Sequence, residues 1–299
     1  MPSVEANGLT LEYEARGNPG DPAIVLVTGL GVQMTFWPDA LLDLLVARGF
    51  RVVRFDNRDA GLSSSLDHLG TPRIMIEYAK YLLHLPLKSA YVLDDMARDT
   101  VALMDALGIE RAHLVGVSMG GMIAQNVAAS FPQRVLTLTS IMSTTGSRKL
   151  PAAEARATRA LLQPAARDGD IEGATRRLMH VLRTIGSRTY PRDEIELRAF
   201  CERHVRRAFK PKGQVRQLVA IAATGDRTQV VKKIAVPTLV IHGDEDPLVP
   251  LACGEATARA IREGGGKASF EVVKGMGHDL PAPLLPQLAD LIGGHCQGV

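Results

Sequence analysis

The sequence has few cysteines, few aromatic residues and no long apolar run. Its three cysteines, Cys201, Cys253 and Cys296, stand at unrelated spacings without a CxxC pair, so we expect neither a disulfide framework nor a zinc site. No stretch approaches the roughly 20 apolar residues that cross a bilayer. The first residues, MPSVEANGLTLEYEARG, lack the basic start and apolar run of a secretory signal. We therefore expect a cytoplasmic protein without stable membrane insertion.

The chain also has little excess charge of either sign, because its formal net charge is only +3. Its distribution is uneven: 20 Lys/Arg but 9 Asp/Glu lie between Ser147 and Lys233. Such a block could face an anionic substrate, a membrane surface or nucleic acid. We interpret it as a solvated helical face rich in arginine, and we expect no nucleic-acid partner.

What the chain does have is 46% apolar residues, arranged as short runs that alternate with helical patterns. The expected strands are Leu9–Ala15, as an antiparallel edge strand, Ala23–Val27, Arg51–Phe55, Ala112–Val117, Val135–Met142, Thr238–His242 and Ser269–Val273. The expected helices are Leu41–Arg48, Val92–Leu107, Met119–Ser130, Glu255–Arg262 and Pro286–Ile292. Strands separated by helices predict an α/β fold with a mostly parallel sheet covered on both faces.

The alternation breaks between Thr145 and Val236, where no convincing strand occurs. The expected helices there are Ala152–Ala165, Ile171–Ile185, Asp193–Phe209 and Gln214–Ala223. We predict that residues 146–233 form a helical insertion into a core domain made of residues 1–145 and 234–299. Leu178, Val181, Leu182 and Ile185 form an apolar stripe at helical spacing, so the insertion needs a surface to cover. A second interruption, Leu62–Ser89, holds another helical pattern.

The segment G-V-S-M-G, Gly116 to Gly120, joins an apolar strand to a helix. That context is typical of a nucleophile elbow, in which a strained turn exposes a serine, here Ser118, at a helix N-terminus. Side chains two residues before and after the serine would crowd the turn, which explains both glycines. The backbone N–H of Met119 would then face a developing oxyanion.

A serine needs a base, and the base needs an orienting acid. His278 follows the last expected strand, while Asp244 and Asp246 follow the strand before it, so each candidate lies beyond a carboxyl end. We favour Asp246 as the acid and keep Asp244 as the alternative. His113 starts a strand and lies at the wrong end of the sheet. His242 ends a strand and could pack near the site.

A second oxyanion donor is expected from the loop after Ala23–Val27, which reads T-G-L-G-V. Gly29 and Gly31 would let the backbone approach a substrate closely. The amide of Leu30 is the candidate donor. The alternative is an ordinary glycine-rich turn between a strand and a helix.

On four motifs the chain resembles the α/β-hydrolase superfamily, and most closely small-molecule carboxylesterases of the aclacinomycin methylesterase group. The motifs are FDNRDAGLSS (Phe55–Ser64), GVSMGGMIAQ (Gly116–Gln125), GDEDPLVP (Gly243–Pro250) and GMGHDLP (Gly275–Pro281). The resemblance implies an α/β-hydrolase fold with an eight-stranded sheet and a helical cap. It also implies a triad of Ser118, Asp246 and His278 with an oxyanion hole at Leu30 and Met119. Many relatives have H-G where this chain has Thr28–Gly29, so the hydrogen bonds that hold this loop are expected to differ.

The predicted function is hydrolysis of small, largely apolar carboxylic esters through an acyl-enzyme, with no metal and no organic cofactor. A cofactor-free haloperoxidase or a C–C bond hydrolase would use the same residues and stays open. A receptor without catalysis on this fold is a further alternative, because a fold does not fix a function. A carboxylate-nucleophile hydrolase is disfavoured, since position 118 is serine. The oligomeric state is not predicted.

Overall fold

The computed structural model describes residues 2–167 and 169–298, and within them eight strands form one sheet. The strands are β1 (Ser3–Ala6), β2 (Leu9–Arg16), β3 (Ala23–Val27), β4 (Arg51–Phe55), β5 (Ala112–Val117), β6 (Val135–Ile141), β7 (Thr238–Gly243) and β8 (Ala268–Val273). Their order across the sheet is β1-β2-β4-β3-β5-β6-β7-β8. The pairs β1–β2 and β2–β4 are antiparallel, and the other five pairs are parallel. This is the α/β-hydrolase arrangement that the sequence predicts.

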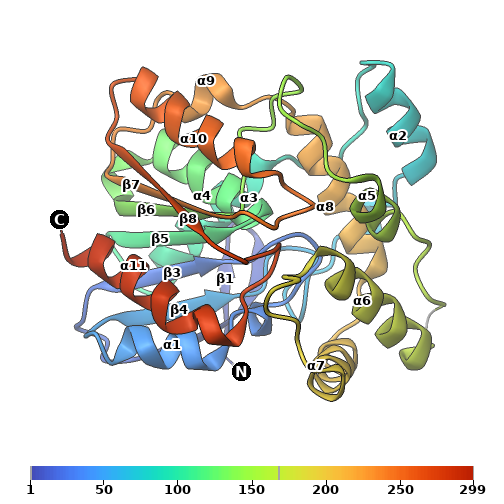
Figure 1. Ribbon diagram of the computed structural model, residues 1–299, viewed down its shortest axis with the longest axis horizontal. Coiled ribbons are helices and arrows are strands. Elements are labelled where there is room, and N and C mark those ends of the chain that lie inside the picture. Colours follow the sequence, from blue (N-terminus) through green and yellow to red (C-terminus); the bar gives the residue numbers. More distant parts are fainter. Residues whose placement is uncertain (1, 168, 299) are drawn as a thin grey trace.

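Helices cover both faces of the sheet. Those of the core are α1 (Asp39–Val46), α2 (Ile74–Leu82), α3 (Leu93–Ala106), α4 (Met119–Ser130), α10 (Leu251–Glu263) and α11 (Leu285–Gln297). Between β6 and β7 lie α5 (Ala155–Leu161), α6 (Ile171–Ile185), α7 (Glu194–Arg207), α8 (Pro211–Thr224) and α9 (Thr228–Val231). Figure 1 shows α3, α4, α9 and α10 on one face of the sheet and α1 and α11 on the other.

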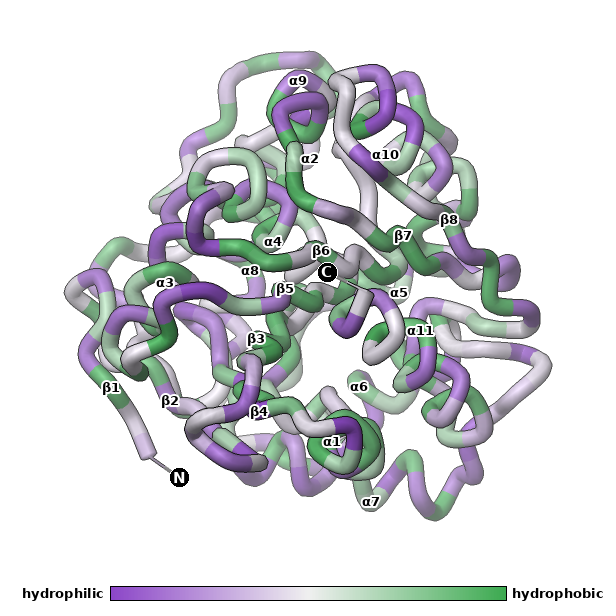
Figure 2. Tube along the Cα trace, turned by 90° about the vertical axis from the view of Figure 1, so that its left-hand side faces the viewer, coloured by the Kyte–Doolittle hydropathy of each residue, from purple (hydrophilic) through white to green (hydrophobic). Residues whose placement is uncertain are grey.

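Alternate strand residues serve two apolar cores, one on each face. Val25 and Val27 of β3 belong to the core beneath α3 and α4, whereas Ile24 and Leu26 belong to the core beneath α1 and α11. All five side chains of β3 are buried, which explains why its sequence, AIVLV, is apolar without alternation. In Figure 2 the central strands accordingly form a hydrophobic band inside the trace. The sheet is thus a rigid base for the loops at its carboxyl edge.

The prediction that Leu9–Ala15 forms the sheet edge is wrong. The edge strand is β1, which pairs with β2 in the register Ala6–Leu9. Asn7 and Gly8 both have positive φ, 52° and 73°, as a two-residue hairpin turn requires. The Asn-Gly pair was the available signal, but β1 has only four residues and too little alternation to stand out.

Element boundaries in the insertion also differ from the prediction. Helix α5 covers only Ala155–Leu161, because Pro151 and Pro164 bound the segment. The short helix α9 was not predicted. It packs on α4 and α10, and its Val231 is buried in the core beneath α4.

The inserted helices α5, α6, α7 and α8 lie together beyond one end of the sheet (Figure 1). Helix α2 stands at the outer side of this group and packs on α8. The strands β3, β5, β7 and β8 direct their carboxyl ends, and hence the predicted functional loops, toward the inserted helices.

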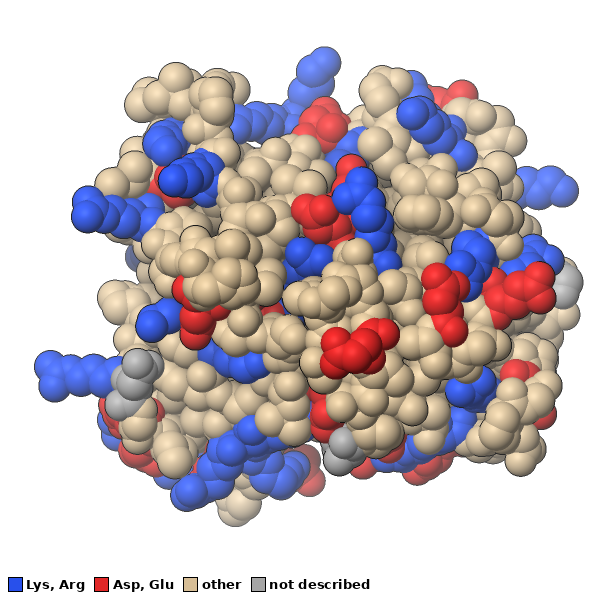
Figure 3. Space-filling view, turned by 180° about the vertical axis from the view of Figure 1, so that it is seen from behind, with Lys and Arg blue, Asp and Glu red and all other residues tan. Residues whose placement is uncertain are grey.

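The expected solvated arginine face is only partly correct. On α6 and α7, exposed arginines pair with exposed acids, as in Arg183–Glu194 and Arg198–Glu172. Arg216 and Arg227, however, are buried. Figure 3 shows positive and negative side chains mixed across the face that it draws. Part of the basic block, including Arg216 and Arg227, is therefore internal.

Candidate active site

Ser118 occupies the sharp turn between β5 and α4. Its φ of 56° and ψ of −120° lie in a region that non-glycine residues rarely adopt, so the serine is held in a strained conformation. Its N–H donates to Ile141 O (2.9 Å) on β6, which fixes the turn to the neighbouring strand. The strained residue is the one that the sequence predicts to be the nucleophile.

Two glycines make this turn sterically possible. A Cβ atom at Gly116 would lie 2.2 Å from the carbonyl oxygen of Gly120, and one at Gly120 would lie 2.1 Å from Val27 O. Real Cβ contacts of this length do not occur, so any larger residue would force the elbow away from β3. The crowding expected from the G-x-S-x-G pattern is present.

The structure brings Ser118, His278 and Asp246 into one hydrogen-bonded chain. His278 Nε2 lies 2.9 Å from Ser118 Oγ, and His278 Nδ1 lies 2.7 Å from Asp246 Oδ2. Both distances are those of good hydrogen bonds. Asp246 and His278 are nearly buried, so bulk water does not weaken these contacts by competition.

The two candidate acids have different partners. Besides His278, Asp246 accepts hydrogen bonds through Oδ1 from Leu248 N–H (2.9 Å) and Val249 N–H (2.8 Å), which fix the carboxylate. Asp244 is exposed and accepts from Gly275 N–H (2.7 Å), so it ties the acid loop to the histidine loop without touching the histidine.

The other candidate histidines have structural surroundings. His242 Nε2 lies 2.7 Å from Val249 O and 3.6 Å from Asp246 Oδ2, and burial lowers the pKa of His242 below its ordinary value. His242 thus supports the acid loop as a neutral imidazole. His113 lies at the start of β5, where it meets Thr137 Oγ1 (2.9 Å), and burial lowers its pKa to about 4.

The loop after β3 approaches Ser118 closely. A Cβ atom at Gly29 would lie 3.4 Å from Ser118 Cβ, so the backbone of this loop borders the serine. Leu30 lines the same pocket as Ser118. Met119 is the first residue of α4, and its N–H has no acceptor within its own helix. The loop after β3 and the first residue of α4 therefore border the serine, and the role of the Leu30 and Met119 amides as oxyanion donors stays a prediction.

Hydrogen bonds that the sequence did not predict hold this loop. Asn57 Nδ2 donates to Thr28 O (3.0 Å) and to Thr28 Oγ1 (3.1 Å). From α8, the buried Gln217 accepts from Gly31 N–H (2.8 Å) through Oε1 and donates to Arg58 O (2.7 Å) through Nε2. The Gly31 amide is thereby already bonded and is not a free donor for an oxyanion.

The FDNRDAGLSS loop is an anchor for α8. Asp59, with φ 66°, accepts two hydrogen bonds from the buried Arg216, at 2.8 Å to Nε and 2.6 Å to Nη2. Burial alone would raise the pKa of Asp59, but Arg216 holds it below its ordinary value. Arg216 also meets Asp67 (2.7 Å) and Gly70 O (3.0 Å). No local sequence pattern identified Arg216 or Gln217, because their partners lie about 150 residues or more away.

The loop after α6 is bonded to the histidine and acid loops. The backbone N–H of His278 donates to Ile185 O (2.8 Å), and Ser187 N–H donates to Asp279 Oδ1 (3.0 Å). Glu245 accepts from the N–H groups of Arg188 and Thr189 at 2.8 and 3.0 Å. Burial raises the pKa of the Asp279 carboxyl to about 6.

The apolar stripe of α6 lines the cavity that contains Ser118, here called the Ser118 pocket. Its volume is about 250 Å³, and Leu178, Val181, Leu182 and Ile185 form one wall. Opposite walls come from the loop after β3 and from α8. The pocket therefore lies between core loops and inserted helices and is mainly apolar.

Two features are absent from the described residues, 2–167 and 169–298. No group of three or more His, Cys, Asp or Glu side chains is arranged to hold a metal ion there. Across the same residues, none of the helices combines the length and apolar character needed to cross a membrane.

Comparison with known proteins agrees with this geometry. The sequence model of the alpha/beta hydrolase fold family matches residues 22–281. The chain is 35% identical over 134 residues to rhodomycin D methylesterase of Streptomyces peucetius, a match covering 45% of this chain and 39% of that protein. It is 27% identical over 268 residues to a putative carbamate hydrolase of Variovorax paradoxus, covering 85% of each chain.

Among solved structures, the enol-lactonase of Burkholderia xenovorans LB400 superposes with a TM-score of 0.73 at 23% identity, covering 99% of this chain and 100% of that one. At this identity the likeness concerns the fold alone.

Proposed function

The chain belongs to the α/β-hydrolase family, and on that basis we propose that it is a serine hydrolase that cleaves carboxylic esters of small molecules. The observation that carries the proposal is the hydrogen-bonded chain from Ser118 Oγ through His278 to Asp246, with links of 2.9 and 2.7 Å. The methylesterase relative supports the ester specificity, although it aligns over less than half of its length.

In the proposed reaction, His278 Nε2 takes the proton of Ser118 as Oγ attacks the ester carbonyl. Asp246 holds the imidazole with Nδ1 protonated and stabilises the imidazolium that forms. The N–H groups of Leu30 and Met119 stabilise the negative charge that develops on the carbonyl oxygen, and these backbone donors require no rearrangement. The imidazolium then protonates the departing alcohol, and water activated by His278 releases the acid.

The inserted residues 146–233 act in this proposal as a cap. Their α6 stripe and α8 side chains close the Ser118 pocket from the side opposite the sheet. Exclusion of water from such a pocket strengthens the electrostatic contacts on which the transition state depends. The apolar walls favour apolar acyl or alcohol groups.

The direct test is hydrolysis of p-nitrophenyl acetate and butyrate by the purified chain. Ser118→Ala is expected to reduce kcat by at least about 10⁴-fold, as removal of a triad serine does in other hydrolases. Ser269→Ala, at an exposed serine on β8, is the matched control and should keep full activity. A fluorophosphonate should label the wild-type chain at Ser118, as read by peptide mass spectrometry.

A Ser118→Ala variant that keeps a substantial fraction of wild-type turnover would refute the assignment. Turnover should also survive exhaustive dialysis against EDTA, because the proposed steps use only side chains and backbone amides. Loss of turnover that a divalent metal restores would contradict the proposal.

A further inference from the structure

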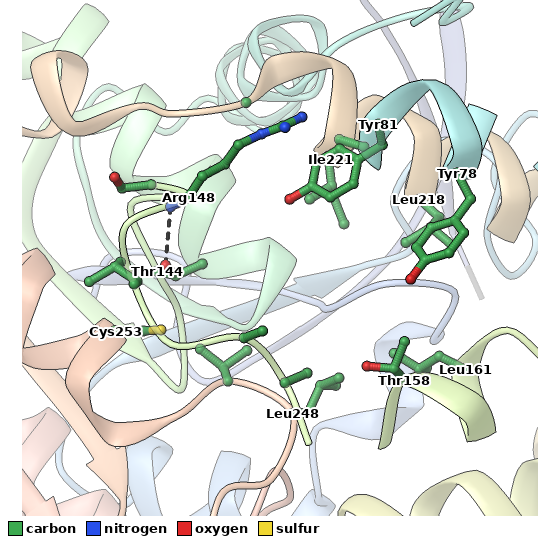
Figure 4. A pocket seen from close by; sticks show the side chains of 18 of the residues that line it. Tyr78, Tyr81, Thr144, Arg148, Thr158, Leu161, Leu218, Ile221, Leu248 and Cys253 are labelled. Carbon is green, nitrogen blue, oxygen red and sulfur yellow. Dashed lines mark hydrogen bonds between the residues drawn. The ribbon is translucent and has the colours of Figure 1, made fainter. Parts of the chain in front are cut away.

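A second cavity lies beside the Ser118 pocket, and none of the steps above uses it. It has a volume of about 590 Å³ and lies between α2, α5, α8 and the loops that follow β6 and β7 (Figure 4). We call it the outer chamber. The Ser118 pocket alone, at about 250 Å³, is smaller than the roughly 300–1,000 Å³ of typical ligand sites. A substrate larger than a simple ester must therefore extend beyond it.

The two cavities share one wall. Six aliphatic or thioether residues line both of them: Met122, Leu161, Leu218, Ile221, Leu248 and Val249. Met122 belongs to the helix that begins at the elbow, and its N–H donates to Ser118 O (3.2 Å). Methionine and leucine side chains change rotamer at low cost, and methionine is the most adaptable of them. The shared wall is thus a partition that contains adaptable side chains.

The lining of the outer chamber differs from that of the Ser118 pocket. Figure 4 shows Tyr78 and Tyr81 extending from α2 toward the cavity, opposite Leu248 and Cys253. The guanidinium of Arg148 lies over the Tyr81 ring at 4.1 Å. Hydroxyl groups of both tyrosines and of Thr158 border this space, together with aliphatic side chains and further polar residues such as His84, Thr144 and Ser147. Phenol rings combined with hydroxyls suit a ring system that itself carries hydroxyl or carbonyl groups.

The acidic residue in this lining is already bonded. Glu77 accepts from Lys80 Nζ (2.8 Å) and from Lys88 N–H (3.1 Å), so its charge is compensated on α2 itself. Arg227 is likewise bonded to Gln125 Oε1 (2.8 Å) and Asn126 Oδ1 (3.2 Å). Apart from Arg148, whose guanidinium lies over the Tyr81 ring, the wall therefore presents mainly aromatic, hydroxyl and aliphatic groups to a ligand.

We propose that the outer chamber binds the bulky, ring-containing part of the ester, while the reacting carbonyl lies beside Ser118 across the partition. This inference rests on the proposed function. It assigns the substrate class as esters with a large oxygenated ring group on one side of the bond. Tyr78 and Tyr81 hold the ring, and Met122 and Leu218 set how easily the ester spans the two cavities.

The test compares kcat/KM for 2-naphthyl acetate and methyl 6-hydroxy-2-naphthoate, which carry the ring on opposite sides of the ester, with kcat/KM for p-nitrophenyl acetate. Thr158→Trp fills the chamber from α5, and Tyr81→Ala removes a ring. Either change should lower the ratio of kcat/KM for a naphthyl ester to kcat/KM for p-nitrophenyl acetate. We expect a decrease of at least about five-fold for one of the two naphthyl esters, as for loss of an aromatic contact. Met75→Ala, on the exposed face of α2, is the matched control and should leave the ratio unchanged.

A third variant acts in the opposite direction. Leu218→Ala opens the partition and should raise the same ratio, while urea unfolding verifies that each variant is folded. If all variants change the naphthyl esters and p-nitrophenyl acetate equally, the two-chamber proposal is wrong, although Ser118-dependent turnover of p-nitrophenyl acetate would leave the proposed function intact. If no ester is turned over, the proposed function itself fails.

Discussion

The loops of the sheet and the inserted helices meet at the Ser118 pocket, yet they supply different things. The sheet loops carry the hydrogen-bonded chain of Ser118, His278 and Asp246. The inserted helices supply the apolar wall, such as Leu178 and Leu182.

The inserted helices are nevertheless fastened to the same loops by polar contacts. Gln217 holds the loop after β3, Arg216 holds the loop after β4, and Ile185 O holds the backbone of His278. These bonds run between segments far apart in sequence and are partly or fully buried. In the proposed enzyme, chemistry, positioning and selectivity would thus belong to separate groups of residues, which can be disturbed one at a time.

The largest effect should come from the loops that carry the proposed chemistry. Asp246→Asn is expected to reduce kcat about 10⁴-fold, because an amide at this place favours the wrong imidazole tautomer. Asp244→Asn is the matched change two residues away and should cost little, since an amide oxygen can still accept from Gly275 N–H. Steady-state rates with p-nitrophenyl butyrate measure both. A larger loss in Asp244→Asn would move the acid to that residue.

The next effect concerns stability. Arg216→Met leaves the Asp59 carboxylate buried without its guanidinium and should lower the free energy of unfolding by about 3–5 kcal/mol. Urea denaturation at pH 7 measures this change. Because the folded pKa of Asp59 lies below its ordinary value, the stabilisation is present above about pH 4 and is lost as the pH falls through the folded pKa.

Two further variants sharpen this measurement. Adding Asp59→Asn to Arg216→Met should recover part of the loss, because no charge is then left buried. Arg198→Met, at an exposed arginine paired with Glu172, should have little effect. Equal losses in Arg216→Met and Arg198→Met would show that burial does not distinguish the two ion pairs.

A smaller effect is expected at the contact between α8 and the loop after β3. Gln217→Leu frees the Gly31 amide and loosens the loop that carries Leu30, so kcat should fall about ten-fold with little change in KM. This is less than the roughly 10²–10³-fold loss of a whole oxyanion donor. Gln229→Leu, at an exposed glutamine on α9, serves as control. A rise in KM alone would mean that Gln217 shapes the pocket and does not position the loop.

The smallest effect should be a change of selectivity. Leu178→Ala or Leu182→Ala enlarges the Ser118 pocket and should shift the preferred acyl chain upward, by about four-fold in relative kcat/KM per methylene, from about 0.8 kcal/mol per buried CH₂. Ile195→Ala, on α7 with 80% of the side chain exposed, is the control. A series of p-nitrophenyl esters from acetate to octanoate measures the shift. An unchanged series would place the acyl chain elsewhere.

Local sequence was sufficient for seven of the eight strands and for choosing the residues proposed to react. A buried run such as AIVLV predicts its strand wherever it packs, because each side chain must leave water. The G-x-S-x-G turn fixes Ser118 through steric exclusion, within the turn at Gly116 and against β3 at Gly120. Chain order then placed Asp246 and His278 at adjacent carboxyl ends, since parallel strands bring those ends to one edge.

Only the tertiary structure decided what surrounds that centre. The sequence of α8 shows a basic, amphipathic helix, but it does not show that Arg216 turns inward to Asp59 while other arginines of the insertion stay in solvent. Which face of a helix is buried depends on the surface that it meets, here a loop about 150 residues earlier. For the same reason, the sequence did not predict the role of Gln217, the hydrogen bonds between Asn57 and Thr28, or the partition between the two cavities. Side chains distant in sequence make each of these features, and their pairing follows from packing the insertion on the sheet loops.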